Sequence, residues 1–128
     1  MPFLGEVMGE GSVDLATKEL VILRVSQLNG CSYCLAAHRP VARAASVPPG
    51  HVAAACGEAP LDGLPPRERA LIDWVDRQTL DPRGIDEELL AGALQHVRHD
   101  QLIELALLVG AITLLNQYCT AFDIPPPA

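Results

Sequence analysis

Apolar residues recur along the chain at the three- and four-residue spacing of helices, and no segment alternates apolar and polar residues as a half-buried strand does. The first clear pattern covers residues 15–28, where a broad apolar stripe follows Ser12 or Asp14 as a helix cap. Four polar residues of this segment are expected to lie mostly away from the stripe: Thr17, Lys18, Arg24 and Gln27. Asn29-Gly30 then marks a break, because glycine often stands just beyond a helix C-terminus.

Further helical segments follow, and turns rich in proline and glycine separate them. They are expected at residues 31–46, 51–56, 66–79, 87–97 and from residue 100 to about residue 118 or 122. A chain of this length can build one hydrophobic core without disulfides or metals. The sequence therefore predicts an all-α protein, a compact single-domain bundle of about five or six helices over residues 1–128.

The last helix is the most apolar, and Asp100 is expected to cap it. Its middle, residues 105–112, has no polar face, so it must be covered on every side, and the chain has few helices for that. We therefore expect a homo-oligomer in which neighbouring subunits supply part of the cover, with Asn116 hydrogen-bonded across the interface. The apolar run at 102–115 is interrupted by Glu104 and is shorter than the roughly 20 residues of a membrane span. It predicts a buried helix of a soluble protein.

The composition is that of a globular domain with an acidic surface. Of the 128 residues, 49% are apolar, and the formal net charge is -7. This charge, without a cluster of Lys and Arg, argues against nucleic acid or an anionic membrane surface as a partner. The N-terminus lacks the basic and apolar regions of a secretory signal, so a cytoplasmic location is expected. In that reducing compartment the four cysteines are expected to include a reactive or metal-binding pair.

Cys31, Cys34 and His38 share one side of the predicted second helix, because residues at i, i+3 and i+7 are neighbours there. Cys31 would stand in the first turn, where unpaired N–H groups and the helix dipole favour a thiolate. A disulfide between Cys31 and Cys34 is sterically reasonable at this spacing. His38 lies one turn beyond Cys34 and can take its thiol proton, although Pro40 predicts a kink or a break just after His38. This arrangement of two thiols and an imidazole is typical of a redox-active site or a metal site.

A glutamate, Glu19, lies eleven residues before the motif Cys31-x-x-Cys34-x-x-x-His38. With this glutamate the sequence resembles the alkylhydroperoxidase D (AhpD)-like proteins of the carboxymuconolactone decarboxylase superfamily, and residues 116–122 are also similar to that family. The resemblance implies an all-helical subunit that assembles into trimers or hexamers. It also implies a dithiol peroxidase that needs no bound cofactor or metal. The decarboxylase branch typically lacks the cysteine pair, so lactone decarboxylation is not expected.

The resemblance further implies a role for each residue of the motif. Cys34 would attack the peroxide O–O bond and become a sulfenic acid, and Cys31 would resolve it to a disulfide. An external dithiol partner, such as a thioredoxin-like or lipoyl protein, would reduce that disulfide. His38 and Glu19 would relay protons to and from the reacting groups. The helix-dipole argument for a Cys31 thiolate competes with this order, and we follow the family because only Cys34 has His38 one turn away.

Other interpretations of these residues stay open at the level of the sequence. The best-studied branch carries histidine where this chain has Tyr33, a poor proton shuttle at neutral pH, so the dithiol could serve redox sensing or assembly with little turnover. The two thiols with His38 and Glu19 are also four plausible zinc ligands. In the simplest interpretation the thiols pack in a helix interface, His38 is a surface group and Glu19 a solvated carboxylate. Cys56 and Cys119 are expected to be buried free cysteines rather than catalytic ones.

Overall fold

The computed structural model describes residues 11–127, which form six α-helices and two short 3-10 helices and contain no strand. In chain order the elements are α2 (Leu15–Leu28), α3 (Ser32–Ala44), α4 (Pro49–Ala55), η1 (Leu61–Gly63), α5 (Pro66–Leu80), η2 (Pro82–Gly84), α6 (Glu87–Leu94) and α7 (His99–Ala121). The predicted all-α class and number of helices are confirmed for this part of the chain. The predicted bounds of the first helix agree with α2 at both ends.

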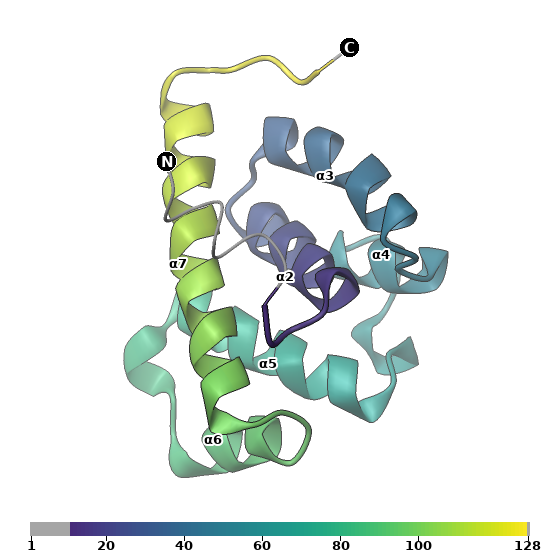
Figure 1. Cartoon of the computed structure of the whole chain (residues 1–128). Coiled ribbons are helices and arrows are strands. Elements are labelled where there is room, and N and C mark those ends of the chain that lie inside the picture. The colour runs from purple at the N-terminus through teal and green to yellow at the C-terminus, as the bar shows by residue number, and fades with distance from the viewer. Residues whose placement is uncertain (1–10, 128) are drawn as a thin grey trace.

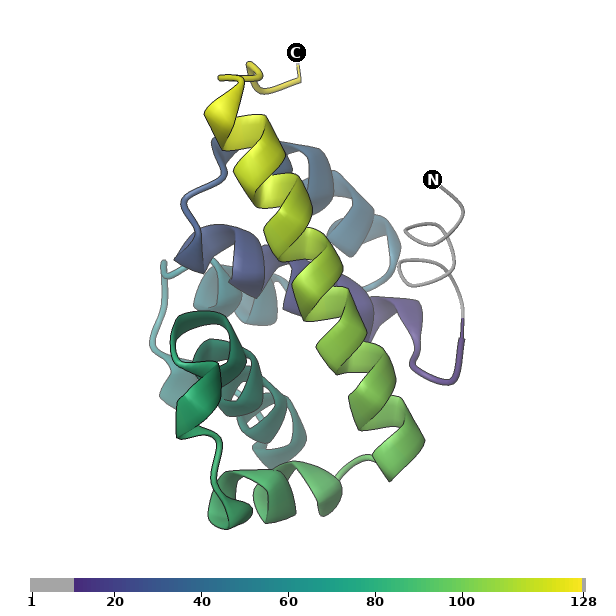
Figure 2. The same cartoon turned by 90° about the vertical axis from the view of Figure 1, so that its left-hand side faces the viewer.

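Helix α2 lies at the centre of the bundle and contacts α3, α4, α5 and α7 (Figure 1). Helices α3 and α4 lie on one side of it, and α7 crosses it on another, as Figure 2 shows from the side. The main core joins α2 to α5, α6 and α7, and includes Val21, Ile22, Val25, Leu71, Val75, Leu105, Leu108, Val109 and Ile112. A second core joins α2 to α3, α4 and α5, and includes Leu20, Leu23, Ala42, Ala54, Ala55 and Ile72. Because α2 contributes to both cores, even its polar residues are drawn inside.

Asp14 caps α2, which confirms one of the two predicted caps. Its carboxylate accepts a hydrogen bond from the backbone N–H of Thr17 at 3.0 Å. Arg67 of α5 donates to the Thr17 hydroxyl at 3.1 Å and lies 3.6 Å from the Asp14 carboxylate. Thr17 is therefore buried between α2 and α5, and the expectation that it lies away from the core is wrong.

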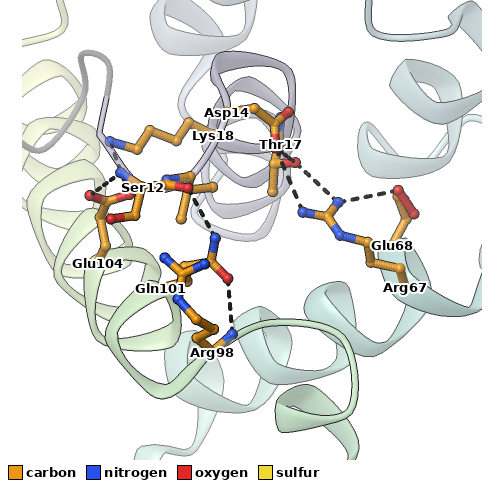
Figure 3. A network of polar contacts seen from close by, with 10 residues as sticks. Ser12, Asp14, Thr17, Lys18, Arg67, Glu68, Arg98, Gln101 and Glu104 are labelled. Atoms are coloured by element: carbon orange, nitrogen blue, oxygen red, sulfur yellow. Dashed lines mark hydrogen bonds and ion pairs between the residues drawn. The ribbon is translucent and has the colours of Figure 1, made fainter.

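Lys18 is a second correction to the predicted polar face of α2. Its side chain is fully buried, and its Nζ lies 3.6 Å from Oε2 of Glu104 on α7 (Figure 3). The same carboxylate accepts hydrogen bonds from the backbone N–H groups of Ser12 at 3.2 Å and Val13 at 2.7 Å. Glu104 thus links the segment before α2, and α2 itself, to the last helix. The pattern along α2 could not show this, because the partner of the ammonium group comes from the other end of the chain.

Helix α3 begins one residue later than expected and continues through Pro40. Cys31 is its N-cap, with an extended backbone (φ −88°, ψ 95°), and the helix runs to Ala44 without a break after His38. Proline removes one backbone N–H from the helix, but the rest of the hydrogen-bond ladder holds the conformation. His38 therefore lies on the same continuous helix as Cys34.

Helix α7 has one face in the main core and another that is open. Arg98 is its N-cap, so the prediction of Asp100 in that role is wrong. Large apolar side chains between 49% and 70% exposed follow the open face: Ile103, Leu107, Leu114, Tyr118 and Phe122. By length and composition alone α7 could cross a membrane, yet eight of its residues are buried in the fold. Cover of the open face by a neighbouring subunit stays a prediction.

The end of α2 depends on a left-handed residue at Gly30, whose φ is +67°. The N–H groups of Gly30 and Cys31 donate to the carbonyls of Gln27 at 3.2 Å and Ser26 at 3.0 Å, which is the hydrogen-bond pattern of a Schellman motif. A Cβ at Gly30 would meet no atom within 4 Å, so the effect of Gly30→Ala comes from the backbone. We expect Gly30→Ala to lower the free energy of unfolding by about 1 kcal/mol.

Two further substitutions serve as comparisons for Gly30→Ala, and the free energies of unfolding of all three variants are measured by urea denaturation. Ser46 holds the same position at the end of α3 with φ +67°, so Ser46→Gly should raise the free energy of unfolding. Gly92 lies inside α6, where a Cβ meets nothing within 4 Å, so Gly92→Ala should be neutral or stabilising. Equal stabilities of Gly30→Ala and Gly92→Ala would contradict the role given to the left-handed turn.

Candidate active site

Cys31 and Cys34 form a disulfide at the start of α3, with their Cα atoms 5.3 Å apart. The turn that ends α2 fixes the backbone of Cys31, since its N–H donates to the carbonyl of Ser26. As N-cap of α3, Cys31 presents its Sγ to the backbone N–H of Cys34, which donates to it at 3.3 Å. Cys31 is 1% exposed and Cys34 is 7% exposed, so Cys34 is the more accessible sulfur.

Glu19 and His38 form a close pair between α2 and α3. Oε1 of Glu19 lies 2.7 Å from Nδ1 of His38. Glu19 is buried, so the interpretation of it as a solvated carboxylate is wrong, while the His38 side chain is 21% exposed. An ionised carboxylate only accepts hydrogen bonds, so Nδ1 of His38 is the donor to Glu19 when that carboxylate is ionised. The carboxylate therefore orients the imidazole and sets its tautomer.

Helix α3 places His38 one turn beyond Cys34. Residues at i and i+4 of a helix have Cβ atoms about 6 Å apart, and α3 is continuous from Ser32 to Ala44. The imidazole that Glu19 orients is thus a neighbour of Cys34 on the same face of α3. The structure pairs Glu19 of α2 with His38 of α3, and joins Cys31 to Cys34 at the start of α3.

A third sulfur joins the pair from a distant part of the chain. The Sγ atoms of Cys31, Cys34 and Cys119 all lie within 4.8 Å of one another, and all three residues are buried. Cys119 lies in the last turn of α7, and Tyr33 and Ile124 pack against the three cysteines. Cys119 is a buried free cysteine, as predicted, but its position beside the disulfide was missed. No histidine lies within one or two helical turns of Cys119 along the chain, so no local motif signalled it.

Asn116 holds α7 in register against the end of α2. Its Oδ1 accepts a hydrogen bond from Nδ2 of Asn29 at 3.0 Å, and its own Nδ2 donates to the hydroxyl of Ser26 at 3.1 Å. These bonds lie within one chain, so the expectation that Asn116 bonds across a subunit interface is wrong. Since Cys119 lies one turn further along α7, the same bonds fix it beside Cys31.

A model of the carboxymuconolactone decarboxylase family matches residues 1–77, which is more than half of the chain and includes the whole segment from Glu19 to His38. The chain belongs to the carboxymuconolactone decarboxylase family. The chain shares its fold with an AhpD-like protein of known structure, and its motif resembles that branch of the superfamily. The uncharacterized protein YdfG of Bacillus subtilis (strain 168) is 27% identical over 113 residues, which cover 88% of this chain and 77% of YdfG.

Solved structures of AhpD-like and peroxidase-related proteins share the fold. A protein of unknown function from Agrobacterium tumefaciens, suggested to be the antioxidant defence protein AhpD, has a TM-score of 0.87 at 23% identity, over 98% of this chain and 86% of that one. An uncharacterized peroxidase-related protein with an alkylhydroperoxidase AhpD core, from Ralstonia eutropha JMP134, has a TM-score of 0.89 at 19% identity, over 98% and 67%. A peroxidase-related protein from Silicibacter sp. TM1040 has a TM-score of 0.86 at 25% identity, over 99% and 68%.

The four residues considered as possible zinc ligands do not form one group of metal ligands in the structure. Glu19 and His38 bond to each other, and the one group of three or more potential metal ligands among residues 11–127 is the cysteine trio. In that trio the Cys31–Cys34 disulfide leaves a single thiol. The donor set of this oxidised form therefore does not favour a metal site.

Cys56 is the second free cysteine and lies outside the site. It is buried in the second core, and this burial is the main cause that raises the pKa of its thiol above the ordinary value. A raised pKa keeps the group protonated and unreactive at neutral pH. Cys56 is therefore a matched control for the three clustered cysteines.

Two cavities of the structure lie away from the cysteines. One of about 540 Å³ lies between the start of α2 and the end of α3, and one of about 300 Å³ lies between α5 and α6. Neither is lined by Cys34 or His38.

Proposed function

We propose that the protein is a thiol-dependent peroxidase that reduces hydrogen peroxide or small organic hydroperoxides through a dithiol and disulfide cycle. One observation carries the proposal: a Cys-x-x-Cys pair at the start of α3 forms a disulfide, and the same helix carries His38, which pairs with Glu19 of α2. A structural disulfide would not need an oriented imidazole next to it. The family of the chain and the fold that it shares with AhpD-like proteins support the same chemistry.

In the proposed cycle the Cys34 thiolate attacks one peroxide oxygen. An S–O bond forms, the O–O bond breaks, and the leaving hydroxide or alkoxide takes up a proton. The Cys31 thiolate then attacks the Cys34 sulfur, which forms the S–S bond and breaks the S–O bond, and the leaving hydroxide takes up a proton to become water. An external dithiol, for which we propose a thioredoxin-like or lipoyl protein, returns two electrons and restores both thiols. No metal or other bound cofactor enters these steps.

The proposed division of labour follows from the environments of the two sulfurs. Cys34 is the more exposed and has His38 one turn away, so it is the better placed to meet a peroxide. Cys31 accepts the N–H of Cys34 at the helix N-terminus, which stabilises it as a thiolate. A stabilised thiolate is a good leaving group when the reductant attacks Cys34. This arrangement reconciles the helix-dipole argument for Cys31 with attack by Cys34.

His38 is proposed to receive the Cys34 proton at Nε2 and to pass it to the leaving oxygen. Glu19 positions the ring and compensates the charge of the imidazolium that forms. We expect Glu19→Gln to lower kcat/KM for peroxide by about a hundredfold, because an amide neither fixes the tautomer nor carries the charge. Stopped-flow measurement of thiol oxidation in the pre-reduced protein gives this rate.

The control for Glu19→Gln is the extent of oxidation by excess diamide, which needs no proton relay and should equal that of the wild type. A kcat/KM for peroxide within twofold of the wild type would contradict the proposed relay. The variant removes one buried charge, so its circular dichroism and melting temperature are compared with those of the wild type first.

Steady-state peroxide consumption tests the proposed function as a whole. The protein, supplied in turn with dithiothreitol, dihydrolipoamide and reduced thioredoxin, should consume many equivalents of peroxide per subunit. The near-complete burial of both sulfurs favours a second candidate, a redox sensor in the same subunit. A sensor would consume about one equivalent of peroxide and then stop even with reductant present. A wild-type thiol count unchanged by peroxide would contradict both.

A homo-oligomer, a trimer or a hexamer, and a cytoplasmic location complete the proposal. The open apolar face of α7 supports the oligomer, since Leu107, Leu114 and Phe122 are at least half exposed in the single subunit. Sedimentation of the purified protein measures its mass. An acidic net charge agrees with a soluble protein that does not bind nucleic acid or anionic membranes.

A further inference from the structure

The proposed cycle uses two sulfurs, but the structure gathers three. Cys119 lies with its Sγ within 4.8 Å of both sulfurs of the Cys31–Cys34 disulfide. It is a free thiol, and its side chain is 9% exposed. A disulfide sulfur can be attacked by any thiolate that reaches it along the S–S axis. The third thiol is therefore close enough to attack after a local movement, because an S–S bond is about 2 Å long and the sulfurs are at most 4.8 Å apart.

Specific contacts on both sides of Cys119 along the chain hold it in position. Asn116, one turn earlier, is bonded to Asn29 and Ser26 at the end of α2, which fixes α7 along its axis. After Cys119 the helix ends in a Schellman motif in which the N–H of Ile124 donates to the Cys119 carbonyl at 2.9 Å. Ile124 also packs on the three cysteines. Contacts on both sides thus hold the thiol against the disulfide.

The helix ends set the direction in which a disulfide would move. Cys31 lies at the N-terminus of α3, where the helix dipole and the N–H of Cys34 favour negative charge. Cys119 lies in the last turn of α7, where the dipole opposes negative charge. Exchange that leaves Cys31 as the free thiolate and Cys119 within the disulfide therefore moves charge to the favoured end.

We propose that Cys119 is a third redox thiol, which attacks Cys34 and converts the Cys31–Cys34 disulfide into a Cys34–Cys119 disulfide between α3 and α7. The Cys119 thiol loses its proton, its sulfur bonds to the Cys34 sulfur, and the bond from Cys34 to Cys31 breaks. The electron pair passes to Cys31, which becomes a thiolate or takes up the released proton. The exchange needs no oxidant or reductant. It rests on the redox cycling proposed for the Cys31–Cys34 pair, but not on peroxide as the oxidant.

This exchange would change which parts of the fold the disulfide connects in the oxidised protein. The Cys31–Cys34 disulfide joins residues of one turn, whereas a Cys34–Cys119 disulfide would tie the first turn of α3 to the last turn of α7. It would also free Cys31, buried at the N-terminus of α3. Oxidation would then change how the last helix is held against α3. The exposed apolar residues next to Cys119 in this part of the chain are Tyr118 and Phe122.

The test uses Cys31→Ser in a Cys56→Ser background, so that Cys34 and Cys119 are the remaining cysteines. Diamide oxidises the reduced, folded protein, and a non-reducing tryptic digest is then analysed by mass spectrometry. Cleavage after Arg24, Arg43 and Arg98 puts the two cysteines in separate peptides, residues 25–43 and 99–128. We expect both thiols to be lost and most of the material to appear as the peptide pair joined through Cys34 and Cys119.

Two further samples give a result even if the Cys31→Ser, Cys56→Ser variant does not fold. Neither sample depends on peroxidase activity. Wild-type protein, equilibrated in an oxidised and reduced lipoamide buffer and trapped with acid, should contain the same joined pair beside the Cys31–Cys34 form. Cys31→Ser that keeps Cys56 should form no joined peptide between Cys34 and Cys56, which lies in the second core. An oxidised Cys31→Ser protein with a free Cys119 thiol, and wild type with only the Cys31–Cys34 form, would overturn the proposal. Because diamide replaces peroxide, a protein without peroxide turnover still gives a result.

Discussion

Cys34→Ser is expected to lower steady-state peroxide consumption by at least about a thousandfold, to the uncatalysed background. A serine hydroxyl stays protonated at neutral pH, is a weak nucleophile toward the O–O bond and cannot close a disulfide with Cys31. No other cysteine is expected to replace it, because Cys31 is less exposed than Cys34 and neither Cys31 nor Cys119 has a histidine one turn further along the chain. Peroxide consumption with dithiothreitol as reductant measures the loss.

Cys56→Ser is the matched control for this substitution. It removes a thiol of the same chain that is buried in the second core and kept protonated by its raised pKa. Its rate of peroxide consumption should equal that of the wild type. A Cys34→Ser protein that keeps more than a tenth of the wild-type rate would contradict attack by Cys34 and point to Cys31 as the nucleophile.

Glu104→Gln is expected to lower the free energy of unfolding by about 3 kcal/mol, the largest effect on stability among single polar substitutions at this network. The Lys18 ammonium is fully buried and lies 3.6 Å from this carboxylate, so the variant leaves a buried positive charge beside a neutral amide. The amide can still accept one of the hydrogen bonds from Ser12 and Val13. The loss should appear as a fall in melting temperature of roughly 10 °C.

A double-mutant cycle separates the ion pair from other effects of the substitution. Lys18→Met, Glu104→Gln and the double variant are compared by urea denaturation, and we expect a coupling free energy of about 2 kcal/mol. The exposed pair of Arg69 and Asp62 is the control, because solvent screens it, and Asp62→Asn should leave the unfolding curve unchanged. Additive effects of the two substitutions at Lys18 and Glu104 would contradict a stabilising pair.

The sequence alone determined features that depend on neighbours along the chain. The bounds of α2, its Asp14 cap and the turn at Gly30 follow from periodicity, capping and a left-handed glycine, which act over a few residues. Cys34 and His38 also lie on one helix, as their spacing predicted, while Cys31 is the N-cap of that helix and not part of its first turn. The same local reasoning predicted a kink or a break after His38, and the helix continues through Pro40 to Ala44 without a break.

Only the tertiary structure decided which residues far apart in the chain became neighbours. Whether Glu19 is solvated or buried against His38, and whether Lys18 faces water or Glu104, depends on helices packing over α2, which its own periodicity does not encode. Cys119 is the clearest case, since nothing within a few turns of it marks a redox site. It became part of the sulfur cluster because α7 crosses the end of α2 in a fixed register. Local spacing specifies a motif, and packing over long sequence separations specifies what surrounds it.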